Sequence, residues 1–509
     1  MAPVPLGLHR RGTMAPHALM LLLFLPPHYT AHVISRSPLC QRLGSRYGSI
    51  MTGGGRAMRR RLRASTSTTA LEKPKVIHTS TTEQPAHSQW GHLFEFAEEK
   101  DGIQYLDHAQ TYKKPKRVLD AIDQYYDSDN ANVHRGAHTL AARATEGYEG
   151  ARAKIASLIN AYDTTEVVYT RGATEAINLV ANTWGNQNIK EGDEIIISVM
   201  EHHSNIIPWQ RLAARTGGVL KFVDLTEQAR EVDGGDAEKE GEGDDHRHVY
   251  NLQQLQSLIT DRTKLVAVCH ASNVLGVVNP IKEIVDIAHK HHAKVLLDAS
   301  QTMARVPIDV QQMGVDFLVA SGHKMMAPSG IGFLWGKYEV LESMEPWQGG
   351  GEMIDEVFLE TSTYAPPPGR FEAGTPAIAE TIGIGAAVDL LTEADVNTVH
   401  DNERLLGNAL YDGLKTIPGV QILGGRSNRL GMASFACPDV NAEELKALLK
   451  EEGYRVASGF HDAQPIHERL GLNDGSIRVS FSVAHGTEDV TRFVDTLSKI
   501  LEGQRARVR

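Results

Sequence analysis

Short apolar segments that alternate with helix-like stretches constrain the fold of this chain more than any other feature. TEVVYT precedes GATEAINLVANTWG, DEIIISVM precedes SNIIPWQRLAARTG, KLVAVCHASN precedes IKEIVDIAHKHH, and KVLLDAS and DFLVASG follow. The short segments are rich in β-branched residues and lack polar alternation, which is typical of strands buried on both faces. Their alternation with helices predicts an α/β fold, in which helices cover both faces of a mainly parallel sheet.

The composition of the chain suggests how it divides into domains. Residues 1–70 form a separate segment, and residues 71–95 are polar and linker-like. We expect residues 96–380 to form a large domain, interrupted at 226–248 by an acidic insertion that cannot build a core. Residues 381–509 are helix-rich with short strands, GMASFACP and SIRVSFSV, and predict a smaller α+β domain.

Residues 1–70 have the character of a targeting sequence. The apolar run ALMLLLFLPP follows Arg10 and Arg11, and an acid-free stretch that contains many Arg and Ser residues comes after it. A signal core followed by a transit-like segment predicts import into a plastid. A mitochondrial presequence and a misassigned gene start are the alternatives. Because no apolar run approaches the ~18 residues of a membrane span, we expect a soluble mature protein.

The charge of the chain is unevenly distributed. Ten of the 52 Lys and Arg residues lie within residues 1–70, which leaves 42 basic against 63 acidic residues in the rest. So acidic a body argues against nucleic acid as a partner. The three cysteines match neither a disulfide framework nor a zinc-binding pattern, so we expect Cys269 and Cys437 to be buried free thiols.

Polar residues follow four of the predicted strands, where ligands collect in open α/β sheets. Thr174 lies near the start of a helix, and the free N–H groups of a helix N-terminus favour a phosphate. The pair His202 and His203 is compatible with metal binding, with a polar loop, or with an imidazole that stacks on a flat ring. No third metal ligand at a suitable spacing is evident, so no metal site is predicted.

The other two strand ends carry an acid and an amine. Asp298 needs a cationic partner if it is buried, and burial of Lys324 would lower its pKa and make it a nucleophile toward carbonyl groups. All four strand ends together fit one ligand, pyridoxal 5′-phosphate (PLP). The helix start with Ser321 and His323 would bind its phosphate, Asp298 its pyridinium nitrogen, and Lys324 its carbonyl carbon.

The quoted segments are similar to those of one family. From Tyr105 to Glu502 the chain resembles the class V aminotransferase superfamily, and within it the cysteine desulfurases and selenocysteine lyases of the SUF pathway type. The matching stretches are YLDHAQTYKKPKRVLDAI, NANVHRGAHTLAARATEGYE, TRGATEAINLVANTWG, MEHHSNIIPWQ, SNVLGVVNPIKEI, LLDASQ, SGHKMMAPSGIGFLWG, GGGEMI and RFEAGTP. The resemblance implies the PLP fold type I, like that of aspartate aminotransferase, and activity on L-cysteine or a related sulfur or selenium amino acid.

The resemblance also implies which residues bind the cofactor. Lys324 would hold PLP covalently and act as the catalytic base, and His202 would stack on its ring. The other cofactor-binding residues would be Thr174, Asn273, Asp298, Gln301, Ser321, His323 and Thr375. Because Thr375 would reach the phosphate of a neighbouring subunit, the resemblance implies a homodimer with shared active sites.

On the substrate side, the resemblance assigns the carboxylate to Arg478, whose guanidinium suits a two-point contact. His134, Arg135 and Asn273 would line the same side. A sulfur-acceptor protein is a further candidate partner.

The loop YRVASGFHDAQPIHERLG, residues 454–471, departs from the family pattern Arg-x-Gly-His-His-Cys-Ala. The cysteine of that pattern takes sulfur from the substrate as a persulfide, and Asp462 stands in its place here. Ala457 replaces the arginine and Phe460 the first histidine. The chain also departs from the family pattern at His108, Gln110 and Ala484-His485-Gly486. They cluster on the substrate side and spare the cofactor side, which favours altered chemistry over simple loss.

A carboxylate cannot accept sulfur as a persulfide, so ordinary cysteine desulfuration should be severely impaired. Reactions in which the β-substituent departs unaided remain open, such as release of selenium or sulfinate. Asp462 would serve as a catalytic general acid for such a group if burial raises its pKa, and would be a solvated loop residue otherwise.

Three functions follow from these observations. The first is a PLP enzyme of the desulfurase group with altered sulfur chemistry. The second is a PLP-dependent epimerase or β-lyase outside sulfur transfer. The third is a catalytically silent partner of an active desulfurase, against which Lys324 and the phosphate-binding residues argue.

Overall fold

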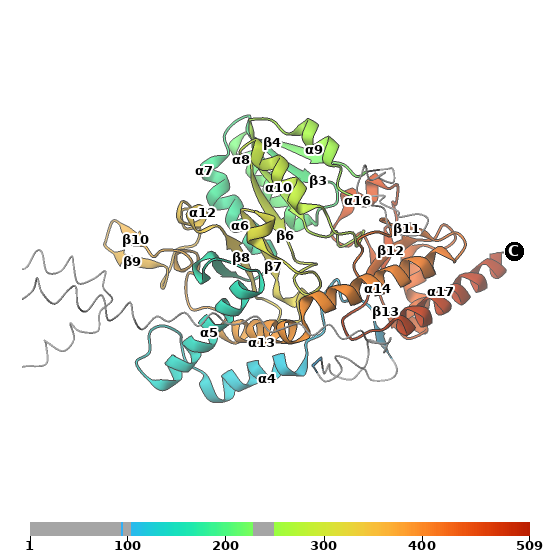
Figure 1. The fold of residues 1–509 in the computed structure, drawn as a ribbon, viewed down its shortest axis with the longest axis horizontal. Coiled ribbons are helices and arrows are strands. Elements are labelled where there is room, and N and C mark those ends of the chain that lie inside the picture. Colours follow the sequence, from blue (N-terminus) through green and yellow to red (C-terminus); the bar gives the residue numbers. More distant parts are fainter. Residues whose placement is uncertain (1–92, 95–102, 227–248, 509) are drawn as a thin grey trace, which may run out of the picture. The chain divides into compact units, whose positions relative to one another are not determined.

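The structure is a computed structural model that describes residues 93–94, 103–226 and 249–508 (Figure 1). The predicted targeting segment, residues 1–70, and all but the first residue of the acidic insertion lie outside the described residues. Import into a plastid or a mitochondrion therefore stays a prediction. Within the described ranges, every helix is too short or too polar to traverse a bilayer.

A seven-stranded sheet lies at the centre of the fold, in the spatial order β2-β8-β7-β6-β5-β3-β4. Its strands are β2 (Val167–Thr170), β3 (Glu194–Ser198), β4 (Val219–Val223), β5 (Thr263–Cys269), β6 (Lys294–Asp298), β7 (Phe317–Ser321) and β8 (Gly332–Gly336). The five strands from β7 to β4 pair in parallel, and β8 is antiparallel to both of its neighbours. The predicted α/β fold with a mainly parallel sheet is confirmed.

Successive residues of each strand pack into two separate apolar clusters, one on each face of the sheet. On β6, Val295 and Leu297 belong to one cluster and Leu296 belongs to the other. The first cluster includes residues of α5 (Thr139–Leu158), α10 (Ile281–Lys290) and α13 (Ile378–Ala394), and the second those of α6 (Ala173–Val180) and α8 (Ile207–Thr216). Both faces are covered, and this is why the strands are apolar at consecutive positions.

The C-terminal part contains a second, antiparallel sheet with its own core. Its strands are β11 (Gln421–Leu423), β12 (Met432–Ala436), β15 (Ser476–Ser480) and β14 (Ala457–Gly459), in that spatial order. They pack against α14 (Val396–Lys415), α15 (Ala442–Glu451) and α17 (Thr487–Val508). Val396 and Val399 at the start of α14 still pack into the first core, and Leu406 further along α14 belongs to the second. The predicted boundary at residue 381 falls inside α13.

The beginning of the described chain joins this second sheet. β1 (Gln104–Tyr105) pairs in parallel with β13 (Tyr454–Arg455), and Asp107 forms an isolated bridge with Ser480 of β15. The turn that follows Asp107 is thereby held beside the strand that carries Arg478.

Candidate active site

The carboxyl ends of β2 and β7 form a cradle at the start of α6. The N-cap of α6 is Gly172, with φ +154° and ψ 176°, a conformation essentially restricted to glycine. A Cβ atom on Gly172 would lie 3.2 Å from the Oγ of Ser321, which accepts a hydrogen bond from the N–H of Ala173 at 2.9 Å. Thr174 is the next residue of α6. Because first-turn N–H groups have no partner within a helix, this cradle fits a phosphate.

A buried acid and an amine lie at two neighbouring strand ends. Asp298 ends β6 and is 7% exposed; its Oδ1 accepts a hydrogen bond from the N–H of Ser300 at 2.9 Å. Among the described residues, no cationic side chain forms an ion pair with it. Lys324 lies in the short helix Gly322–Lys324 after β7, where burial lowers its pKa although the attraction of Asp298 opposes this. A buried carboxylate without a cation is costly, so the pair fits a ligand with a protonated ring nitrogen and a carbonyl group.

Two histidines near Lys324 are held in their neutral form. Burial and the charge of Lys324 lower the pKa of His202 and of His323 to about 4. Nδ1 of His202 accepts a hydrogen bond from the N–H of Ser204 at 3.1 Å, so its proton is on Nε2. A neutral, flat ring suits stacking on a cofactor ring. In the part of the chain that the structure describes, no group of three or more acidic, His or Cys side chains is arranged to hold a metal ion.

The loop that carries Asp462 is fixed by its backbone. The carbonyl oxygen of Asp462 accepts a hydrogen bond from the N–H of His203 at 2.7 Å, and that of His461 accepts one from Nδ2 of Asn273 at 2.7 Å. His461 and Asp462 are both in the left-handed region, with φ of +51° and +55°. The Asp462 side chain is 59% exposed, and its Oδ2 lies 3.7 Å from Nε2 of His202, too far for a hydrogen bond. The burial that a general acid would need is therefore absent.

Arg478, in the middle of β15, is 1% exposed. Its Nη2 lies 3.1 Å from Oδ1 of Asp107, and its Nη1 donates to the carbonyl oxygen of Asn273 at 3.2 Å. Burial lowers the pKa of Arg478, and the charge of Asp107 opposes the shift. Through Asn273, this arginine is linked to the Asp462 loop, as expected for one substrate site.

Of the remaining predicted residues, Gln301 is buried, whereas His134 and Arg135 each contact a glutamate. Gln301 is buried and donates from Nε2 to the carbonyl oxygen of Ala109 at 2.9 Å. Nε2 of His134 lies 2.9 Å from Glu149, and Nε of Arg135 lies 2.5 Å from Glu352. In the described residues, neither of these two side chains bonds to the group around Lys324.

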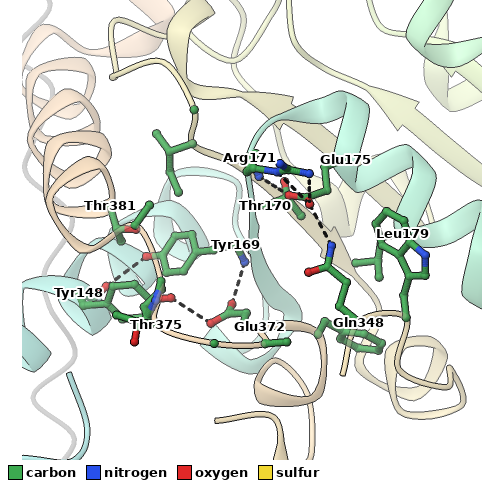
Figure 2. A pocket seen from close by; sticks show the side chains of 18 residues that line it. Tyr148, Tyr169, Thr170, Arg171, Glu175, Leu179, Gln348, Glu372, Thr375 and Thr381 are labelled. Carbon is green, nitrogen blue, oxygen red and sulfur yellow. Dashed lines mark hydrogen bonds and ion pairs between the residues drawn. The ribbon is translucent and has the colours of Figure 1, made fainter. Parts of the chain in front are cut away.

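Thr375 lines a cavity to whose walls Lys324 does not contribute. This cavity, of about 440 Å³, is also lined by Trp347, Gln348 and Glu372, and Thr375 is the only predicted site residue among the side chains that line it (Figure 2). Its side chain is exposed.

Two features of the site were missed by the sequence reasoning. The first is Glu201, a fully buried carboxyl group that is hydrogen-bonded with Ser198 and, at 2.7 Å, with Nδ2 of Asn205; burial raises its pKa to about 7. It holds the turn that carries His202, and its place next to that histidine in the sequence was the available signal. The second is the hydrogen bond between Gln110 and Arg478; the sequence showed Gln110 only as a departure from the family pattern.

Neither free cysteine replaces the missing loop thiol. Cys269 is buried at the end of β5, and burial raises its pKa well above the ordinary range. Cys437 is only partly buried, contrary to the expectation from the sequence, yet burial still raises its pKa to about 11. Because the thiolate is the nucleophile, both are poor acceptors of sulfur.

Two of the departures from the family pattern, His108 and His485, pack against each other. His108 packs edge-on against Tyr105, Tyr112 and His485, with ring centroids 5.0, 4.8 and 5.5 Å apart. Nδ1 of His485 in turn lies 2.8 Å from the Oγ of Ser482.

The phosphate cradle, the buried acid and the amine, placed at the strand ends of an α/β sheet, define a PLP-dependent enzyme. The sequence pattern of the family described as Aminotransferase class-V matches residues 104–240 and 242–493. The chain belongs to this family.

Individual relatives define its group within the family. A probable cysteine desulfurase of Synechocystis sp. is 48% identical over 396 residues, which cover 77% of this chain and 90% of the relative. One of Halalkalibacterium halodurans is 44% identical over 398 residues, 78% of this chain and 92% of the relative. The crystal structure of the cysteine desulfurase CsdA of Escherichia coli is 35% identical, with a TM-score of 0.73, and the match covers 83% of this chain and 99% of that one. This chain is a PLP-dependent enzyme of the cysteine desulfurase group.

Proposed function

We propose that the chain cleaves the Cβ–S or Cβ–Se bond of cysteine or a related amino acid and releases the sulfur or selenium without storing it on the loop. One observation carries the proposal: the residues for cofactor and substrate carboxylate are in place, and a half-exposed Asp462 faces His202 where the thiol would be. A sulfur-acceptor protein would receive released sulfide rather than a persulfide.

Each side chain of the site has a separate role in the proposed reaction. Bound PLP supplies an electron sink for negative charge at the substrate Cα. Lys324, with its pKa lowered by burial, provides a neutral amine that takes the proton from Cα. Asp298 would keep the ring nitrogen of bound PLP protonated, and Arg478 would hold the substrate carboxylate. The flat ring of His202 would lie against one face of the cofactor.

The fate of the substrate sulfur depends on Asp462, which carries a carboxylate where the family pattern has a thiol. With no thiol to attack the sulfur, cysteine loses it as sulfide, and water then converts the remaining fragment to pyruvate and ammonia. All atoms balance without an oxidant or a reductant. Selenium and SO2 can leave selenocysteine and cysteine sulfinate as neutral species, while the electrons of the broken bond stay on Cβ, which then takes a proton. We therefore expect alanine from these two substrates.

A substrate panel tests this function. The purified enzyme would be incubated with cysteine, selenocysteine and cysteine sulfinate, and alanine, pyruvate, free sulfide and protein-bound sulfur would be measured. We expect cysteine to give more pyruvate than alanine, with no sulfur on the protein. Ready conversion of cysteine to alanine with persulfide on the enzyme would overturn the proposal.

We also propose that the enzyme is a homodimer in which the hairpin of β9 (Ile354–Val357) and β10 (Ser362–Tyr364) packs against a second copy. Large apolar side chains are exposed on and near this hairpin, among them Val357 (63%), Phe358 (60%) and Leu359 (105%). Exposed apolar side chains in one group mark protein interfaces. Thr375 follows the hairpin in the chain, is exposed and lines a cavity without Lys324, which supports a role in the neighbouring active site.

The double substitution Phe358→Asp/Leu359→Asp is expected to weaken the dimer at least about 30-fold, because it places two charges in an apolar contact. Sedimentation of the holoenzyme over a range of concentrations measures the change. Tyr162→Asp is the matched control, since Tyr162 is 79% exposed and lies elsewhere in the chain. An unchanged dimer in the double variant would contradict the proposed interface.

A further inference from the structure

The carboxylate-binding arginine already has an internal partner in this chain. Nη2 of Arg478 donates a hydrogen bond to Oε1 of Gln110 at 3.2 Å. Gln110 lies in the turn that follows β1, and this turn is fixed beside β15 because the N–H of Ala109 donates to the Oγ of Ser480 at 2.8 Å. The family pattern that the chain resembles has alanine in place of Gln110, and alanine cannot make this contact.

The hydrogen bonds that Arg478 already makes show which of its N–H groups a substrate carboxylate can reach only by displacing another acceptor. A guanidinium has five of them, two on each Nη and one on Nε. Both hydrogens of Nη2 are used, one by Asp107 and one by Gln110, while Nη1 donates to Asn273. Nε is buried and has no hydrogen-bond partner among the described residues. A carboxylate contacts a guanidinium at two points either through both Nη atoms or through Nη2 and Nε. Both modes need Nη2.

Of the two acceptors on Nη2, Gln110 is the one that can leave. Asp107 carries the opposite charge to Arg478, and only 21% of its side chain is exposed. Gln110 is neutral and exposed, and its Nε2 forms no hydrogen bond within the described part of the chain. An incoming carboxylate that displaces the Gln110 carbonyl would therefore gain a hydrogen bond from Nη2.

We propose that Gln110 is a specificity-determining residue, which competes with the α-carboxylate of the substrate for Arg478 and so reduces the preference of the site for amino acids over simple amines. The inference rests on the proposed function for the identity of the ligand, an α-amino acid. It concerns only the carboxylate contact, so ligands without that group are bound equally with or without Gln110.

Binding of L-alanine and of ethylamine tests the proposal, because the two differ by the carboxylate and neither has a β-group to lose. Each would be titrated into the PLP-loaded enzyme, and the change in visible absorption gives the dissociation constant. In Gln110→Ala, we expect L-alanine to bind about fivefold more tightly, as one competing hydrogen bond to a charged group is removed. Ethylamine binding should stay the same.

Gln110→Glu and Gln253→Ala complete the design. A carboxylate at position 110 would pair with Arg478 by charge, so L-alanine should bind at least about tenfold more weakly and ethylamine as before. Gln253 is exposed on α9 (Leu252–Leu258), and its replacement should change neither constant.

The outcomes separate this inference from the proposed function. If Gln110→Ala binds L-alanine no better than the unchanged enzyme, or if both ligands change alike, the role of Gln110 is wrong and the proposed function stands. If no amino acid alters the absorption of any of these proteins, the proposed function falls, and the inference falls with it.

Discussion

Replacement of Lys324 by alanine is expected to abolish the yellow colour of the purified enzyme and to lower its turnover by about 10³-fold or more. Lys324 lies in the short helix that follows β7, near Asp298. Burial lowers its pKa, which favours the neutral amine needed for attachment to the cofactor and for proton transfer. The measurements are the visible absorption spectrum and the rate of pyruvate formation from cysteine.

Lys114→Ala is the matched control for this experiment. Burial lowers the pKa of Lys114 to about 8, and its Nζ donates to the carbonyl oxygen of Tyr112, close to His323. It is thus a second partly buried lysine in the same region, and its loss should leave the colour in place. A yellow, active Lys324→Ala variant would contradict the assignment of the cofactor lysine.

The second large effect is expected from Asp462→Cys, which should place sulfur on the protein. The backbone of the loop is held by contacts that do not involve the Asp462 side chain, so a cysteine would occupy the same position opposite His202. Its left-handed φ of +55° disfavours cysteine relative to aspartate by about 1 kcal/mol, which the anchored loop tolerates. We expect the ratio of alanine to pyruvate from cysteine to rise at least about tenfold. Cyanide treatment of the protein after turnover measures the bound sulfur.

Asp462→Ala separates the new thiol from the loss of the carboxylate. This variant should form no bound sulfur. If Asp462→Cys also forms none, then residue 462 is not by itself what withholds persulfide chemistry, and the replacements at Ala457 and His485 become the cause.

The sequence predicted those parts of the molecule that depend on local patterns. The three consecutive apolar residues of β6, Val295 to Leu297, are buried on two faces, and this requirement is visible in the sequence itself. Asp298 and Ser321 could be located because the carboxyl ends of parallel strands meet at one edge of a sheet. Lys324 comes shortly after Ser321 in the sequence, so its place could be predicted for the same reason.

Contacts that depend on side-chain direction between distant segments were not predictable in this way. Gln110 was visible as a departure from a family pattern, but its contact with Arg478 requires the pairing of Asp107 with Ser480, for which no local signal exists. The exposure of Asp462 likewise follows from backbone angles set by partners in two other segments, at His203 and Asn273. Periodicity and spacing carry no information on either.

The pairing of β1 and Asp107 with the last sheet also has a consequence for how the enzyme is made. Ala109 and Ser480 are 371 positions apart, yet one hydrogen bond joins them beside Arg478. During synthesis, the segment that emerges early must wait for β15 before it finds its partner, whereas the parallel sheet can assemble sooner from strands that are close in sequence. The binding site for the substrate carboxylate is therefore among the last parts of the molecule to form. A ribosome-bound chain that lacks β15 should not yet bind its ligand.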